Sequence, residues 1–276
     1  MSTSERDARA ARAQSPLHDE HLRRLAPLVS AKLMEVIERR TRLDVSTKGA
    51  AYDLVTDADC SMEEWLWDET RRAFPADGFL GEERGWRAGP TGGTDWVVDP
   101  IDGTVNLVNG VGWACCSIGA LFEGAPAAGL IVDPYRNEIF LTSSPDGGTE
   151  LNGAPVTVAA GPALAGRLVI LEVPSGTSTA ALAAIAEVVL AKDGAVRSMG
   201  SGALALATVA AGRALAAVHL DPCIWDIAAG VALVEHAGGI VLAGDGPYVA
   251  GRPGPLVAGN REVCAQLQAP LRALVR

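Results

Sequence analysis

The stretch Trp96-Val97-Val98-Asp99-Pro100-Ile101-Asp102-Gly103-Thr104-Val105-Asn106 says most about the fold and the chemistry of this chain. The apolar residues before Asp99 predict a buried strand that ends at this acid. The following proline keeps Asp99 extended, while Gly103 permits a turn and the close approach of a ligand to the backbone. Asp99 and Asp102 should then project from the rim of a sheet beside two free N–H groups. Because carboxylates bind hard cations and N–H groups bind phosphate oxygens, the stretch predicts a magnesium-dependent phosphate site.

An ordinary loop is the alternative interpretation of the same stretch. Asp-Pro and Asp-Gly steps are common in turns, where the aspartate side chain accepts hydrogen bonds from its own backbone. The choice between the two interpretations therefore depends on acids elsewhere in the chain.

Composition bounds the class of protein. The chain has 276 residues, enough for one large unit or two compact halves. It is 49% hydrophobic and 20% charged, which indicates a globular fold. The formal net charge of -10 argues against nucleic acid and anionic lipid as partners. It would also repel a phosphorylated substrate, so phosphate chemistry requires bound cations that reverse the local field.

Cysteine usage and the N-terminus indicate a cytoplasmic protein. Five cysteines form no CxxC pair, which favours buried thiols in a reducing compartment over disulfides or zinc. Residues 1–14 are polar and charged, and we expect a flexible tail there. No apolar stretch approaches the roughly 20 residues of a membrane span, so no membrane association is expected.

The pattern along the chain predicts helices and strands that alternate in layers. Helices are expected at 16–42 and 58–74, a strand at 79–81, a loop at 84–94, an antiparallel meander over 113–142 and a loop-rich stretch at 143–165. Beyond it, strands are expected at 168–172, 195–197, 214–219, 239–242 and 255–258, and helices at 179–191, 203–211, 225–237 and 261–273. This order favours layered sheets and helices. We expect residues 15–276 to form one catalytic unit, with a metal-binding half at about 15–145 and a substrate-facing half at about 146–276.

Four acidic segments share one pattern, in which an acid begins or ends a regular element. They are Asp53-Leu54-Val55-Thr56-Asp57-Ala58-Asp59, Gly81-Glu82-Glu83, the opening stretch, and Trp225-Asp226-Ile227-Ala228-Ala229-Gly230. Such acids are costly unless cations or N–H groups compensate them. Each also has a plainer interpretation: Asp57 or Asp59 as the N-cap of the following helix, Asp226 as an N-cap or first-turn residue, and Glu82-Glu83 as a solvated turn.

Taken together and in this order, the four segments resemble the inositol monophosphatase family. The family's hallmarks are D-x-V-T-x-x-D, G-E-E, D-P-x-D-G-T and W-D-x-A-x-G, and the resemblance runs from about Lys48 to Gly259. It implies an α-β-α-β-α sandwich of the inositol monophosphatase and fructose-1,6-bisphosphatase type. It also implies a magnesium-dependent phosphomonoesterase that is inhibited by Li⁺ and forms a homodimer.

The resemblance assigns a set of metal ligands. Glu82, Asp99 and the carbonyl of Ile101 would hold a first Mg²⁺, and Asp99, Asp102 and Asp226 a second. Two or three ions per site are implied, with Mn²⁺ as a substitute. Oxygen ligands of this kind suit Mg²⁺ independently of the resemblance. Glu82 would also help to orient the attacking water.

Further residues receive catalytic and phosphate-binding roles from the same resemblance. Thr104, supported by Asp59, would orient the attacking water. The N–H groups of Gly103 and Thr104 would hold the phosphate, and Lys48 and Asp53 match family positions near it.

The substrate end departs from the family pattern. Members that act on inositol phosphate typically carry a glutamate seven residues before the W-D aspartate, and this chain has His219 there. The histidine is either a substrate contact or a satisfied residue at a strand end. Ser175 matches a loop serine that reaches substrate, and Ser201-Gly202 matches a pair whose backbone lines the pocket. Ser201 would also suit a helix cap.

The expected partner is therefore a small phosphorylated metabolite. Relatives also act on fructose 1,6-bisphosphate, histidinol phosphate and 3′-phosphoadenosine 5′-phosphate, but small uncharged pocket residues favour a compact polyol or sugar phosphate. A non-catalytic regulatory member of the fold is the competing hypothesis, and the complete water-activating set argues against it. A nucleic-acid-associated role is disfavoured by the acidic balance.

Overall fold

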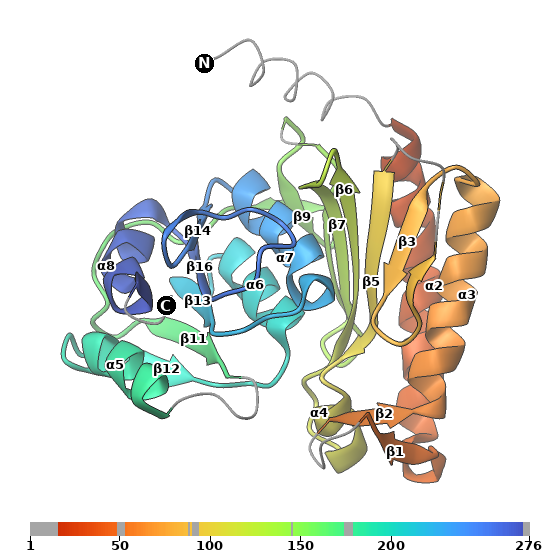
Figure 1. The fold of residues 1–276 in the computed structure, drawn as a ribbon, viewed down its shortest axis with the longest axis horizontal. Helices are drawn as coiled ribbons and strands as arrows, with labels where there is room; N and C mark the ends of the chain where they lie inside the picture. The colour runs from red at the N-terminus through yellow and green to blue at the C-terminus, as the bar shows by residue number, and fades with distance from the viewer. Residues whose placement is uncertain are drawn as a thin grey trace.

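The chain folds into five alternating layers, which confirms the predicted sandwich. The computed structural model describes residues 16–48, 53–87, 89, 94–144, 146–173 and 179–272. In Figure 1 the layers run from helices α2 and α3, through an eight-stranded sheet, helices α6 and α7 and a six-stranded sheet, to helices α5 and α8. The expected tail at residues 1–14 and the loop serine Ser175 lie outside the described residues.

The first two layers come from the N-terminal part of the chain, residues 16–156. Its helices are α2 (Pro16–Glu38), the 3-10 turn η1 (Arg40–Arg42), α3 (Asp57–Ala73) and α4 (Thr104–Asn109). Its strands are β1 (Val45–Thr47), β2 (Leu54–Thr56), β3 (Gly78–Gly81), β4 (Gly85–Arg87), β5 (Thr94–Asp102), β6 (Cys115–Phe122), β7 (Ala125–Asp133), β8 (Glu138–Thr142), β9 (Thr149–Leu151) and β10 (Ala154–Val156). The sheet order is β10-β9-β8-β7-β6-β5-β3-β4, and β1 and β2 form a separate hairpin.

The outer face of this sheet is covered because α2 and α3 are amphipathic. Leu22, Leu25 and Val29 recur at helical spacing and are completely buried in a core that includes Trp96 of β5. Burial of each such side chain contributes about 2 kcal/mol. On β6 the adjacent Cys115 and Cys116 are both buried, in cores on opposite faces of the sheet, as strand alternation predicts.

The remaining layers come from the C-terminal part. Its helices are α5 (Thr179–Leu190), α6 (Gly202–Ala210), α7 (Ile224–His236) and α8 (Arg261–Arg272). Its strands are β11 (Leu168–Glu172), β12 (Ala195–Arg197), β13 (Ala216–His219), β14 (Ile240–Ala243), β15 (Gly246–Pro247) and β16 (Leu256–Gly259), in the order β12-β11-β13-β16-β14-β15. Among the described helices, none is both long and apolar enough to cross a membrane.

Helix α7 lies very close to the first sheet because small residues face each other. A Cβ added at Gly119 of β6 would lie 2.8 Å from the Cβ of Ala228, and one at Gly129 of β7 would lie 2.5 Å from the carbonyl oxygen of Ala229. Larger side chains at these positions would push the helix away. The close approach carries the start of α7, and with it Asp226, to the end of the sheet where β5 finishes.

Several sequence-based boundaries were wrong. Strand β5 does not end at Asp99 but continues through Pro100 to Asp102, and its register with β6 shifts between the two acids. A single irregularity of this kind keeps a strand paired while it re-aims side chains. Short strands also occupy stretches expected to be loops, namely β4 within 84–94 and β9 and β10 within 143–165. Tertiary pairing stabilises these short segments although their local sequence is turn-like.

Candidate active site

Three carboxylates from two distant parts of the chain meet in one cluster. Asp99 and Asp102 lie among the last four residues of strand β5, and Asp226 lies in the first turn of α7. One oxygen of each lies within 4.8 Å of the others. Asp99 and Asp102 are buried and Asp226 is partly buried. The register shift in β5 and the close packing of α7 together produce this arrangement.

The cluster is electrostatically unfavourable without a cation. Burial raises the pKa of Asp99 well above its ordinary value, and repulsion from Glu82, Asp102 and Asp226 adds to the effect. Burial and Asp102 likewise raise the pKa of Asp226. Burial raises the pKa of Asp102 to about 6, although hydrogen bonds from Ser201 and Ala203 oppose the shift. Oxygen donors that repel one another in this way fit a hard divalent ion, which would remove the repulsion.

Glu82 forms an ion pair with Lys48. It follows β3, and its N–H donates to the carbonyl oxygen of Val98 at 3.1 Å, which fixes it beside β5. The Nζ of Lys48 donates to Glu82 Oε1 and to Glu83 Oε1, both at 2.7 Å. Burial alone would lower the pKa of Lys48, but the two glutamates raise it. The ammonium group thus occupies a place at Glu82 where positive charge is favoured.

Asp59 and Thr104 form a hydrogen-bonded pair beside the cluster. Asp59 Oδ2 accepts from the N–H and the hydroxyl of Thr56, at 2.8 and 2.5 Å. This leaves Asp59 Oδ1 for the Thr104 hydroxyl, 3.1 Å away, which also lies 3.0 Å from the carbonyl oxygen of Ile101. Burial raises the pKa of Asp59, while the Thr56 and Thr104 donors oppose the shift. The N-cap of α3 is Thr56 and not Asp57 or Asp59, but Asp59 takes part in capping as the third helical residue, because its side chain completes a capping box with Thr56.

Asp102 is held in place by the start of α6. Its Oδ2 accepts a 2.6 Å hydrogen bond from the Ser201 hydroxyl and a 2.7 Å bond from the N–H of Ala203. Ser201 is at the same time the N-cap of α6 and accepts from the N–H of Leu204. The Ser201 hydroxyl, the Ala203 N–H and the Cys115 thiol all reach Oδ2 of Asp102, so the other oxygen of the carboxylate is suited to bind a metal.

Two neighbouring cavities meet at the acidic cluster. A cavity of about 180 Å³ is lined by Asp53, Leu54, Glu82, Asp99, Ile101, Asp102, Gly103, Thr104, Val105, Gly200 and Asp226. A second cavity, of about 230 Å³, is lined by Asp102, Glu172, Val173, Gly200, Gly202, His219, Leu220, Asp221, Pro222 and Asp226. They share Asp102, Gly200 and Asp226, so a ligand anchored at the acids in the first cavity can extend into the second.

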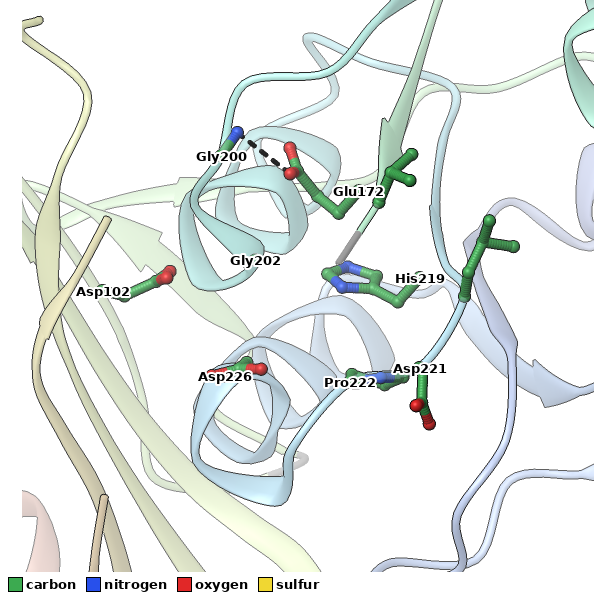
Figure 2. Close-up of a pocket in the computed structure, with 10 residues that line it drawn as sticks. Asp102, Glu172, Gly200, Gly202, His219, Asp221, Pro222 and Asp226 are labelled. Carbon is green, nitrogen blue, oxygen red and sulfur yellow. Dashed lines mark hydrogen bonds between the residues drawn. The ribbon is translucent and has the colours of Figure 1, made fainter. Parts of the chain in front are cut away.

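His219 faces this second cavity as an uncharged ring (Figure 2). Burial lowers its pKa to about 4, and its Nε2 has no hydrogen-bond partner among the described residues. A Cβ at Gly202 would lie 3.2 Å from His219 Cε1, so the glycine leaves room for the ring. A buried ring nitrogen without a partner is available to a hydroxyl group of a ligand.

The structure brings together the described residues that the sequence indicated. The first cavity is lined by Asp53, Ile101, Gly103 and the acids. Two further residues contact this lining, Lys48 through Glu82 and Asp59 through Thr104. The second cavity is lined by Gly202 and His219, and Ser201 donates to Asp102. Gly103 adopts φ +96, and a Cβ there would lie 2.8 Å from the carbonyl oxygen of Trp113, so this turn requires glycine. The loop interpretation is true in one detail, because Asp99 Oδ1 accepts from the N–H of Ile101.

Two buried glutamates near the site were missed. Glu63 of α3 accepts from the N–H groups of Glu83 and Arg84, at 2.7 and 3.1 Å. Glu172 of β11 also accepts hydrogen bonds from two backbone N–H groups, those of Met199 and Gly200. The signal for Glu63 was its spacing, since it lies four residues after Asp59 and three before Leu66, on the buried stripe of α3.

Comparisons with known proteins identify the family of this chain. The inositol monophosphatase family model matches residues 18–275. The chain is 35% identical over 206 residues to an inositol monophosphatase of Mesembryanthemum crystallinum, covering 72% of this chain and 76% of the relative. It is 36% identical over 245 residues to the Nus factor SuhB of Xylella fastidiosa, covering 86% and 87%. The structure of the extragenic suppressor protein suhB from Bartonella henselae superposes with a TM-score of 0.85 at 30% identity, covering 93% of this chain and 98% of that one. The chain belongs to the inositol monophosphatase family.

Proposed function

We propose that this protein is a magnesium-dependent phosphomonoesterase that hydrolyses the monophosphate ester of a small cyclitol, polyol or sugar. The observation that carries the proposal is the convergence of Asp99, Asp102 and Asp226 within 4.8 Å, with Glu82 lining the same cavity. Family membership supports it, since relatives named inositol monophosphatase share about a third of their residues with this chain.

In this proposal the acids hold two or three Mg²⁺ ions. Glu82, Asp99 and the carbonyl oxygen of Ile101 bind one, and Asp99, Asp102 and Asp226 bind another. Bound Mg²⁺ would activate water and neutralise the charge that develops on the phosphate and the leaving oxygen. Mn²⁺ should substitute, and Li⁺ should inhibit by competing at a weakly held position near Asp102 and Asp226.

The side chains around the acids then orient the reacting groups. The Thr104 hydroxyl is hydrogen-bonded to Asp59 Oδ1 and orients the attacking water. As the hydroxyl oxygen takes a proton from the water, the hydroxyl gives its own proton to Asp59 Oδ1. The raised pKa of Asp59 suits this acceptor role. The N–H groups of Gly103 and Thr104 bind phosphate oxygens. Lys48, which holds Glu82, and Asp53 complete the wall on the phosphate side.

The alcohol part of the ester would occupy the second cavity. The described residues that line it include four acids and the uncharged His219 but no lysine or arginine. A second phosphate would therefore find no cationic side chain there, which argues against fructose 1,6-bisphosphate and 3′-phosphoadenosine 5′-phosphate. Hydroxyl groups suit the His219 nitrogen and the carboxylates as hydrogen-bond partners. Ser175, outside the described residues, is proposed as a further contact, and a homodimer as the assembly.

The proposal is tested by phosphate release from a panel of phosphorylated metabolites with Mg²⁺. We expect activity on polyol or sugar monophosphates, and the Asp99→Asn variant should lose at least about a hundredfold because it removes the shared ligand. Activity that persists in this variant would refute the assigned site.

A non-catalytic role is the second candidate, because several relatives of similar identity are named Nus factor SuhB. It predicts that the wild-type protein releases no phosphate from any ester of the panel although it binds Mn²⁺. Sedimentation of the purified protein tests the expected homodimer separately.

A further inference from the structure

Glu172 receives two hydrogen bonds from a single turn of the backbone. It is the last residue of β11 and is 8% exposed. Its Oε1 accepts from the N–H of Met199 and its Oε2 from the N–H of Gly200, both at 3.0 Å. In Figure 2 the carboxylate lies beside the start of α6, with the bond to Gly200 drawn. Both oxygens are thus directed at the same turn.

The carbonyl groups of this turn are held from the other half of the chain. Asn106 of α4 directs its Nδ2 at the carbonyl oxygens of Met199, at 2.8 Å, and Gly200, at 3.3 Å. Gly200 has φ +75, and a Cβ there would lie 3.2 Å from Asn106 Nδ2, so this approach favours glycine. The N–H groups of the turn therefore bind to the second sheet and its carbonyls to the segment that follows Asp102-Gly103.

The turn leads directly to the residues that hold Asp102. The next residue is Ser201, whose hydroxyl lies 2.6 Å from Asp102 Oδ2, and Ala203 donates its N–H to the same oxygen at 2.7 Å. A displacement of the Met199–Gly200 turn would move both donors. The geometry of Asp102 therefore depends on groups that Glu172 anchors.

A charged residue is a costly choice at position 172. Burial raises the pKa of Glu172 to about 7, the Met199 and Gly200 donors oppose the shift, and Asp102 adds repulsion. Nearby titratable groups offer little compensation: His219, its partner in the register of β13, is uncharged, and Asp221 beyond it is acidic. Arg197 on β12 is exposed and donates to the carbonyl oxygen of Val196. Burial of the Glu172 carboxylate is unfavourable for folding, so we look for a role of this residue in the site.

We propose that Glu172 is a positioning residue, which anchors the Met199–Gly200 turn so that Ser201 and Ala203 hold Asp102 in its metal-binding arrangement. This inference rests on the proposed function, since it gives Asp102 the role of a metal ligand. Glu172 does not itself touch the metal or the reacting phosphate in this proposal. Hydrogen-bond partners of metal ligands commonly change metal affinity or activity by 10- to 100-fold, roughly, when they are removed.

The first test is Glu172→Gln, which preserves shape and removes the charge. Glutamine offers one acceptor and one NH₂ donor, so one of the two N–H groups would face another donor. We expect Mn²⁺ affinity, measured by calorimetry without substrate, to fall about tenfold, and kcat/KM to fall by a similar factor. Glu187→Gln, at an exposed position of α5 in the same half, is the matched control and should change neither.

A double-mutant cycle tests whether Glu172 acts through Ser201. If it does, adding Glu172→Gln to Ser201→Ala should lower Mn²⁺ affinity by clearly less than the roughly tenfold that it causes alone, since only the Ala203 donor to Asp102 then remains to be displaced. Wild-type Mn²⁺ affinity in Glu172→Gln, or effects of the two changes that simply multiply, would overturn the proposal. So would a failure of both Glu172→Gln and Glu172→Asp to fold, by circular dichroism, because Glu172 would then serve the fold alone.

The substrate-free measurement separates this inference from the proposed function. A wild-type protein that binds Mn²⁺ but hydrolyses no ester would refute the phosphatase proposal. In that case the Mn²⁺ affinities of the variants would still support or overturn the role of Glu172.

Discussion

The hydroxyl of Ser201 donates a 2.6 Å hydrogen bond to Oδ2 of Asp102, and this bond joins the two halves of the chain at the acidic cluster. The two residues are 99 positions apart in sequence. Ser201 also caps α6, so one side chain contributes both to helix stability and to the orientation of a proposed metal ligand.

Ser201→Ala should therefore lose stability and metal affinity together. Loss of the cap should cost about 1 kcal/mol in the free energy of unfolding, and loss of the Asp102 contact should weaken Mn²⁺ binding about tenfold. Chemical denaturation and calorimetry measure the two effects. Asn260→Ala is the control, since Asn260 accepts from the N–H of Val263 at the start of α8, outside the cavities. A serine variant with the same metal affinity as Asn260→Ala would contradict this prediction.

The position of Glu82 should depend on the tight packing of the neighbouring Gly81. A Cβ at Gly81 would lie 2.2 Å from Cδ of Glu63, whose carboxylate accepts from the N–H of Glu83. We expect Gly81→Ala to lower the free energy of unfolding by about 1–3 kcal/mol, as overpacking does, and to weaken Mn²⁺ binding through displacement of Glu82. Gly246→Ala is the control, because nothing lies within 4 Å of a Cβ there. Equal stability of the two variants would rule the prediction out.

The metal-free protein should become less stable as pH rises. Burial raises the pKa of Asp102 to about 6 and that of Glu172 to about 7, above the ordinary values near 4 that these groups have in an unfolded chain. A raised pKa adds stability that is complete below the unfolded value and is lost as pH rises through the folded value. In scanning fluorimetry with EDTA, Tm should fall between about pH 6.5 and about pH 8, above the range in which the buried His219, whose pKa is lowered to about 4, adds stability as pH rises.

Mg²⁺ should remove the part of this dependence that comes from Asp99, Asp102 and Asp226, because the bound cations favour the ionised form of these carboxylates. The rise in Tm on adding Mg²⁺ should accordingly be larger at about pH 8 than at about pH 5. A Tm of the metal-free protein that is flat or rises over this range would show that the acidic cluster is not strained.

His219 should influence the choice of substrate. Because the ring is buried, uncharged and beside the acids, His219→Glu would add an anionic acceptor to the second cavity. We expect this variant to change the kcat/KM ratio between inositol 1-phosphate and other polyol phosphates about tenfold in favour of inositol, the size of one charged hydrogen bond. His219→Gln keeps a neutral polar group and should change the ratio much less. The same ratio in all three proteins would show that His219 does not contact the alcohol.

The family, the layered fold and the identity of the acids could be predicted from the sequence, because they depend on local patterns. Gly103 specifies a turn, and the periodicity of Leu22, Leu25 and Val29 specifies a buried helix face. Motifs such as D-P-I-D-G-T are contiguous in the sequence, so they can be recognised without a structure.

How these groups meet could not be predicted in this way. The shift in β5 between Asp99 and Asp102, the approach of α7 through Gly119 and Ala228, and the two N–H groups bound by Glu172 depend on contacts between distant segments. A lone glutamate at a strand end has no sequence signature of such a role, because its partners come from a turn 27 and 28 residues away. Long-range packing, and not local preference, selects those partners.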